Sequence, residues 1–103
     1  MEYGFGEYIL IFKALSDETR LRIVKMLTKG RTCACKILDE FHFTQPTLSY
    51  HMKQLTDSGV VEGEKEGKWV YYTLNFERIK VLYKFIDKLT PALQNVGECE
   101  EGQ

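Results

Sequence analysis

The chain has 103 residues, of which 44% are hydrophobic, which is enough to bury the core of one domain and too little for a second. Its 14 basic and 15 acidic residues nearly cancel, so the total charge predicts no general attraction to nucleic acid. Several acids gather near the end of the chain, among them Glu98, Glu100 and Glu101. We therefore expect a slightly basic domain at residues 1–93 and a flexible acidic tail at 94–103, and the net charge does not exclude DNA as a partner.

The N-terminal segment shows no targeting or membrane signal. Glu2 follows Met1 where a signal peptide has basic residues, and the apolar run at 8–12 is far shorter than a signal-peptide core or a membrane span. We therefore expect a cytoplasmic protein with no membrane partner. Residues 8–15 are apolar on more than one face, which favours a helix that packs inward on one side and against a partner on another.

The next segment contains a predicted helix and a cysteine pair. Ser16 is the predicted N-cap of a helix that ends near Gly30. Beyond it, Cys33 and Cys35 are separated by Ala34 alone, a spacing unsuited to a structural disulfide between elements. Because thiolates select soft ions, the pair indicates metal or redox chemistry in a reducing compartment, with two buried structural cysteines as the alternative.

Two consecutive helices are predicted between residues 36 and 58. Residues 36–41 favour a short helix, and Thr44 is the predicted N-cap of the next, with Pro46 in its first turn. This second helix carries an apolar stripe formed by Leu48, Met52 and Leu55. The tight connection at 41–43 gives the pair the layout of a helix-turn-helix, whose second helix enters the major groove. A plain helical hairpin is the alternative.

The rest of the chain predicts a hairpin and a terminal helix. Residues 60–64 and 69–74 are rich in β-branched and aromatic residues, and 65–68 supply a glycine-containing turn, so a wing follows the second helix. The terminal helix, bent or ended at Pro91, has a heptad-like seam of Ile79, Leu82, Ile86, Leu89 and Leu93. Apolar residues on a second face of this helix indicate a dimer interface. The predicted fold class is mainly α with a small β-hairpin (α+β), a winged helix-turn-helix in the order αααα-ββ-α, dimeric through its first and last helices.

The face of the second helix opposite its apolar stripe is polar and uncrowded. Gln45 suits paired hydrogen bonds to adenine, the ring of Pro46 suits a thymine methyl group, and Lys53 can neutralise a phosphate. An ordinary solvated helix face is the alternative, but the neighbouring elements favour DNA. The predicted DNA contacts of this segment are Thr44, Gln45, Pro46, Thr47, Ser49, Tyr50 and Lys53.

The predicted wing tip adds two lysines. Lys65 and Lys68 are placed to reach phosphates or the minor groove, whereas Glu64 and Glu66 beside them oppose such a contact. His51 flanks the apolar stripe, which favours a packing histidine over a residue that reads bases.

Four motifs together resemble the ArsR/SmtB family of metalloregulators. They are ALSDETRLRI at 14–23, the Cys33-x-Cys35 pair, TQPTLSYHM at 44–52 and GKWVYY at 67–72. The resemblance runs from about Phe12 to Leu74 in the family's order. It implies a homodimeric winged helix that binds double-stranded operator DNA, represses metal-resistance operons and leaves the DNA when metal binds.

Within that family, a Cys-x-Cys at the start of the helix before the recognition helix resembles the sensors of arsenite and antimonite or of cadmium and lead. The resemblance thus implies As(III) or Sb(III) as inducer at Cys33 and Cys35, with cadmium or lead as the alternative and no organic cofactor. Lys36 and Leu38 stand where the arsenic sensors often have an acid and a third cysteine. A third ligand is then expected from elsewhere in the chain. Cys99 is the one remaining cysteine, and it is either this third ligand or a residue with no role in the site.

The sequence leaves three rival functions open. The first is a winged-helix regulator without metal, in which Cys33 and Cys35 form a redox switch. The second, a thiol enzyme, is disfavoured because the chain lacks a Cys-x-x-Cys and a cofactor loop, so we expect no enzyme. The third is a winged helix that binds protein rather than DNA.

Overall fold

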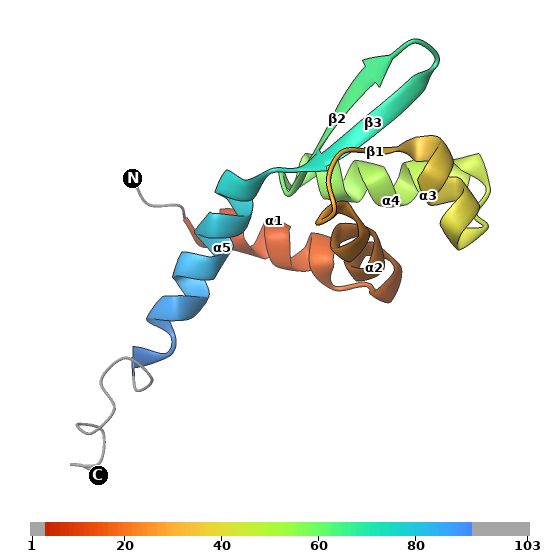
Figure 1. Ribbon diagram of the computed structural model, residues 1–103. Coiled ribbons are helices and arrows are strands. Elements are labelled where there is room, and N and C mark those ends of the chain that lie inside the picture. The colour runs from red at the N-terminus through yellow and green to blue at the C-terminus, as the bar shows by residue number, and fades with distance from the viewer. Residues whose placement is uncertain (1–3, 92–103) are drawn as a thin grey trace.

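The computed structural model describes residues 4–91, so the predicted tail at 94–103 and Cys99 lie outside the described residues. The elements are α1 (Phe5–Leu15), α2 (Glu18–Leu27), β1 (Thr32–Cys33), α3 (Ala34–Phe41), α4 (Gln45–Asp57), β2 (Val61–Glu66), β3 (Trp69–Leu74) and α5 (Phe76–Lys88). Their order confirms the predicted succession of four helices, a hairpin and a last helix (Figure 1). It also adds one strand, β1, that the sequence analysis did not predict.

The three strands form one antiparallel sheet in the order β1-β3-β2. The hairpin β2–β3 is paired along its whole length, from Val61 opposite Leu74 to Glu66 opposite Trp69. The edge strand β1 is two residues long and pairs Thr32 with Tyr72. Two residues are too few to show the alternation of apolar and polar side chains by which a strand is recognised in a sequence. The strand forms because β3 supplies its hydrogen-bonding partners.

The core lies where the first four helices meet the base of the hairpin. Its fully buried large side chains include Ile11, Ile23, Leu27, Ile37, Met52 and Leu55. The predicted stripe of α4 is buried as expected, with Leu48, Met52 and Leu55 at most 5% exposed. Burying each of these side chains stabilises the fold by about 1.5–3 kcal/mol, which holds the opposite, polar face of α4 outward.

Helix starts differ from the prediction in two places. Asp17 rather than Ser16 caps α2, since its carboxylate accepts a hydrogen bond from the Arg20 N–H at 3.0 Å. The Ser16 hydroxyl instead donates to the carbonyl of Phe12 at 2.6 Å, which closes the end of α1. The short helix α3 begins at Ala34, two residues earlier than the predicted Lys36, because Cys33 acts as its N-cap.

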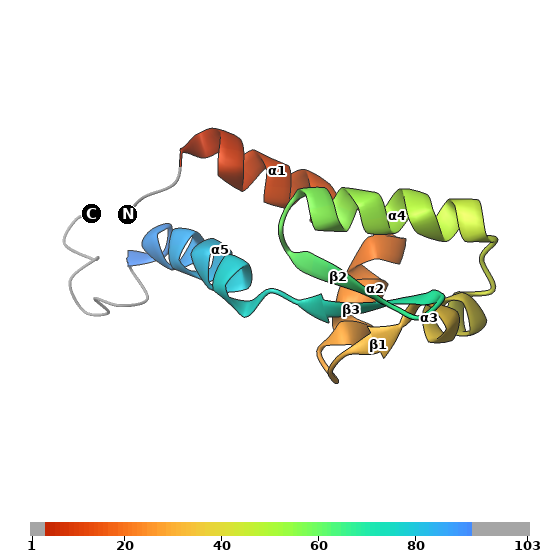
Figure 2. The ribbon, with the colours of Figure 1, turned by 90° about the horizontal axis from the view of Figure 1, so that it is seen from above.

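The first and last helices lie at one end of the molecule, and the tip of the hairpin lies at the other (Figure 2). Tyr8 of α1 stacks on Phe85 of α5 with ring centres 4.3 Å apart, and Arg78 of α5 pairs with Glu7 of α1. The last helix ends at Lys88, before Pro91, and none of its residues is buried. No helix within residues 4–91 is long and apolar enough to cross a bilayer.

Candidate DNA interface and cysteine site

The turn between α3 and α4 is built on a left-handed residue. His42 has a φ of 57° and caps α3, and its N–H donates to the carbonyl of Leu38 at 2.8 Å. The rings of Phe41 and Phe43 stack across this turn with centres 5.2 Å apart. The Thr44 hydroxyl then accepts from the Thr47 N–H at 3.3 Å, so Thr44 caps α4 as predicted. The two helices therefore meet in the tight turn that a helix-turn-helix requires.

All seven predicted DNA contacts of this segment are exposed, namely Thr44, Gln45, Pro46, Thr47, Ser49, Tyr50 and Lys53. Tyr50 stands out, with 58% of its surface open to solvent. Three of the others are already engaged. The Thr44 hydroxyl donates to that of Thr47 at 3.0 Å, and the Lys53 ammonium pairs with Asp57 at 3.1 Å. This exposed pair contributes little to stability, so Lys53 can exchange its partner for a phosphate.

His51 packs between the helices, as predicted. Its ring lies 5.7 Å from that of Phe43, and its Nδ1 is 3.1 Å from Nη1 of Arg20. Only 13% of its side chain is exposed. The residue therefore joins α4 to α2 and stands apart from the exposed face.

The wing brings together charges that the sequence does not connect. Lys65 and Lys68 are exposed near its tip, as predicted. The two acids beside them share Arg31 as a partner, whose guanidinium lies 3.7 Å from Glu64 and 3.0 Å from Glu66 and offsets one of their two negative charges. Sequence reasoning missed Arg31, because only the pairing of β1 with β3 carries it to the wing.

Arg31 is held in this place by an aromatic ring. Its guanidinium carbon lies 4.2 Å from the ring centre of Tyr71, which is a cation–π distance. The side chain is 39% exposed, so its ion pairs are partly screened by solvent. These ion pairs therefore change the local charge of the wing more than they stabilise the fold. With Arg31 beside them, Glu64 and Glu66 repel an approaching phosphate less strongly than the sequence suggests.

The two cysteines of the pair meet at the start of α3. Their sulfur atoms are joined as a disulfide, with the Cα atoms 5.2 Å apart. The expectation that this spacing does not suit a structural disulfide assumed two separate elements. Cys33 instead has an extended backbone just outside the helix and Cys35 lies in its first turn, which turns both side chains to one side. The Cys35 N–H also donates to the Cys33 sulfur at 3.3 Å.

In reduced form these sulfurs offer one ion two thiolates from a single turn of chain, which is the donor chemistry that soft ions prefer. Cys35 is exposed and Cys33 is half-buried, so an ion can reach them. Within residues 4–91 no three His, Cys, Asp or Glu side chains lie close enough together to hold a metal. The described residues thus fit two ligands of a thiolate site, and the predicted third, Cys99, lies outside them.

The position of Cys33 links the pair to both parts of the interface. As N-cap it begins α3, the first helix of the helix-turn-helix. As a residue of β1 it is paired with Tyr71 of β3, a strand of the wing. A change at the cysteines therefore acts on two elements at once.

A helix-turn-helix followed by an antiparallel hairpin and a terminal helix defines the winged helix-turn-helix class of domains. Residues 17–63 match the family model described as bacterial regulatory protein, arsR family. The chain belongs to the ArsR family.

Relatives in sequence span most of the chain. An uncharacterized HTH-type transcriptional regulator of Methanocaldococcus jannaschii is 45% identical over 80 residues, covering 77% of this chain and 90% of that protein. An arsenical resistance operon repressor of Staphylococcus xylosus is 39% identical over 99 residues, covering 96% and 88%. A homolog of a cadmium resistance transcriptional regulatory protein in Staphylococcus aureus is 40% identical over 73 residues, covering 70% and 60%.

Solved structures support the fold. An ArsR family transcriptional regulator superposes with a TM-score of 0.82 at 21% identity, covering 91% of this chain and 97% of that one. A domain from Mycobacterium bovis, described as a homodimeric winged helix-turn-helix, has a TM-score of 0.69 at 22% identity, covering 91% and 87%. At these identities the likeness establishes the architecture alone.

Proposed function

We propose that the chain is a homodimeric repressor that binds double-stranded operator DNA and is released when As(III) or Sb(III) binds the thiolates of Cys33 and Cys35. The observation that carries this proposal is the cysteine pair at the N-cap of α3, directly before an exposed polar α4. The Staphylococcus xylosus relative, named as an arsenical resistance operon repressor, supports it. The setting is the cytoplasm, where DNA is present and thiols are kept reduced.

In this proposal α4 lies in the major groove and the wing reaches the adjacent minor groove. The exposed face of α4 contacts bases and phosphates, while Lys65 and Lys68 contact the backbone beside them. In this proposal residues 1–93 form the DNA-binding and dimerisation domain. The near-neutral total charge is compatible with this role because two acids on the wing, Glu64 and Glu66, are paired with Arg31.

The dimer forms through α1 and α5. Large apolar side chains are exposed on both, namely Phe5, Ile9, Leu10 and Phe12 on α1 and Phe76, Tyr83 and Ile86 on α5, with Leu89 at the C-cap of α5. Exposed apolar surface concentrated on two neighbouring helices is typical of an interface. A second copy joined here presents two α4 helices to one face of a duplex, about 34 Å apart, which matches a pseudo-palindromic operator.

The inducer supplies a soft Lewis acid for which thiolates have high affinity. Cys33 and Cys35 hold it, with Cys99 as third ligand. Holding one ion with both sulfurs would disturb the hydrogen bond that Cys33 accepts from the Cys35 N–H, and with it the first turn of α3, which contacts α4. The change in DNA affinity is a coupling free energy of about 1–3 kcal/mol. Cadmium or lead at the same thiolates is the alternative, and the cadmium-regulator homolog in Staphylococcus aureus supports it.

The test is a fluorescence-anisotropy titration of thiol-reduced protein on DNA from upstream of its gene, with arsenite, antimonite, Cd²⁺ or Pb²⁺ added. We expect arsenite or antimonite to weaken binding about 5- to 150-fold. The double variant Cys33→Ser/Cys35→Ser should bind DNA and lose the response, and Cys99→Ser should weaken it. Unchanged affinity with every ion contradicts the metal switch, and salt-insensitive or absent DNA binding indicates a protein-binding winged helix instead.

A second candidate function is a thiol-redox regulator, which the close approach of the Cys33 and Cys35 sulfurs at the start of α3 favours. Two thiols lose two electrons and two protons as the S–S bond forms, and hydrogen peroxide takes them up as two molecules of water. DNA release from the reduced protein by peroxide, where arsenite has no effect, supports this function. DNA release by arsenite that persists under anaerobic, peroxide-free conditions contradicts it.

A further inference from the structure

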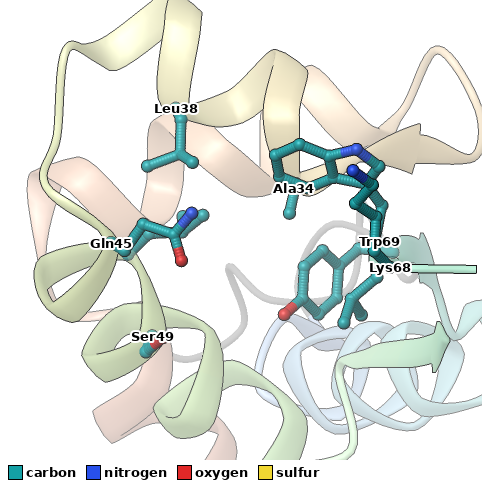
Figure 3. A pocket seen from close by; sticks show the side chains of 9 residues that line it. Ala34, Leu38, Gln45, Ser49, Lys68 and Trp69 are labelled. Atoms are coloured by element: carbon teal, nitrogen blue, oxygen red, sulfur yellow. The ribbon is translucent and has the colours of Figure 1, made fainter.

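A hollow of about 290 Å³ lies between α4 and the wing. Gln45 and Ser49 of α4 stand on one side of it, and Lys68 and Trp69 of the wing stand on the other (Figure 3). Its apolar wall includes Leu38, Leu48 and Tyr72. The hollow therefore opens between the two elements that the proposed function brings against DNA.

The polar groups of the hollow are all suited to an anion. Lys68 supplies a positive charge, and the Gln45 amide and Ser49 hydroxyl supply N–H and O–H donors. No described carboxylate lines the hollow, although the whole chain carries 15 acids. Burial raises the pKa of the Tyr72 phenol, which therefore stays neutral and adds no negative charge. The hollow thus has donors and one cation but no group that repels an anion.

The geometry of a duplex places one particular anion here. A recognition helix in the major groove and a wing in the neighbouring minor groove straddle the sugar–phosphate strand that separates the two grooves. That strand must pass the gap between α4 and the hairpin, which is where the hollow lies. Each of its phosphodiesters carries one negative charge and exposed oxygen acceptors.

We propose that this hollow seats one backbone phosphate of the DNA, held by Lys68, Ser49 and Gln45. The inference rests on the proposed DNA binding and deepens it. The apolar walls limit competing water, which strengthens charge-assisted hydrogen bonds to the phosphate. Gln45 is thereby assigned to the backbone, whereas its residue type and helix position alone suggested a contact to adenine.

The same hollow touches the cysteine site. Ala34 lines it, is 9% exposed, and lies in the chain between Cys33 and Cys35. Tyr72 lines it too and is paired with Thr32 in the sheet, next to Cys33. A change at the cysteines therefore acts on two parts of the wall, Ala34 and Tyr72. Through this wall the state of the cysteines alters the contact with the phosphate, and with it the DNA affinity.

The first test separates backbone contacts from base contacts. DNA affinity is measured against salt for Lys68→Met, Gln45→Ala and the charge-matched control Lys25→Met, on the operator and on copies with single base-pair changes. We expect the slope of log K against log salt to fall in magnitude by about 1.8 in Lys68→Met, about 0.9 for each subunit of the proposed dimer, and to stay unchanged in Lys25→Met. Gln45→Ala should weaken binding by the same factor on every copy.

An unchanged slope in Lys68→Met, or a Gln45→Ala effect confined to one base pair, overturns the phosphate seat while leaving the proposed function intact. Failure of the unmodified protein to bind DNA in any thiol state contradicts the proposed function, and the inference falls with it. These two failures are therefore distinguishable in one set of titrations.

The second test uses Trp69, the one tryptophan in the chain, as a reporter inside the hollow. Its emission should change on adding DNA, and also on reducing the cysteines in the absence of DNA. A response of DNA affinity to cysteine state with unchanged Trp69 emission contradicts the link through Ala34. Benzoate serves as a probe for a small aromatic anion. If Trp69 emission responds to benzoate but not to DNA, the occupant of the hollow is a small aromatic anion and the proposal is overturned.

Discussion

Nη1 of Arg20 lies 3.1 Å from Nδ1 of His51, which joins α2 to the proposed recognition helix α4. Arg20 is 8% exposed, and its Nε also donates to the carbonyl of Ala14 at the end of α1 at 2.7 Å. Asp17 approaches the same ring atom, with Oδ2 4.0 Å from Nδ1. One buried guanidinium thus fixes where three helices meet and how α4 is presented.

Arg20→Met keeps the length of the side chain and removes its donors. The Ala14 carbonyl is left without this partner in a buried place, so we expect the free energy of unfolding to fall by about 1–3 kcal/mol. Urea denaturation measures it. The control is Arg22→Met, because Arg22 is 66% exposed and pairs with Glu18 along the helix surface. That control should cost about 0.5 kcal/mol or less, and equal losses in both variants would contradict a structural role for Arg20.

Asp17 makes stability depend on acid pH. The Arg20 backbone N–H donates to its carboxylate, and this bond, with the nearby charges of Arg20 and His51, holds the pKa of Asp17 below its ordinary value. A depressed folded pKa stabilises the protein above the unfolded value of about 3.9, and this contribution is lost as pH falls through the folded pKa.

Replacing the cap tests this dependence. Asp17→Ala should lower the free energy of unfolding by about 1 kcal/mol at neutral pH, with the difference from the unmodified protein shrinking below about pH 4. Thermal denaturation between pH 7 and pH 3 measures it. A difference that is constant over this range would show that the charge of Asp17 contributes nothing.

Arg31 should increase DNA affinity through the charges on the wing. In Arg31→Gln, Glu64 and Glu66 lose their positive partner next to the proposed phosphate contacts. We expect binding to weaken roughly fivefold at low salt, about 1 kcal/mol, and less at high salt because the charges are exposed and screened. Adding Glu64→Gln and Glu66→Gln to that variant should restore affinity in an anisotropy titration. A loss that persists in the triple variant would instead indicate a direct contact between Arg31 and DNA.

The exposed apolar face of α5 should control oligomeric state. Tyr83 is 66% exposed, and Tyr83→Glu places a charge on the proposed dimer surface. We expect the dimer dissociation constant to rise at least about tenfold, or 1.4 kcal/mol, with an unchanged circular dichroism spectrum. Sedimentation equilibrium measures it. Lys84→Gln is the control with the same change of charge on a polar residue of that helix, and an equal effect in both variants would contradict this interface.

The helices and the hairpin were readable from the sequence because their signals are local. The stripe of Leu48, Met52 and Leu55 recurs at helical spacing, and the Thr44 cap immediately precedes it, so both were predicted correctly. The cap of α2 was misplaced by one residue because Ser16 and Asp17 are both good caps. The choice between them depends on Ser16 being drawn to the Phe12 carbonyl, which only the turn out of α1 decides.

By itself, the sequence determined the class of this protein: the order of its elements, the polar face of one helix, and two cysteines one residue apart just before a helix-turn-helix. Tertiary structure alone decided what those parts do to one another. Only it pairs Thr32 and Cys33 with the wing, brings Arg31 to Glu64 and Glu66, and closes the hollow around Lys68. The physical reason is range, since propensity and capping act within a few residues, whereas sheet pairing and charge contacts depend on where the folded chain returns.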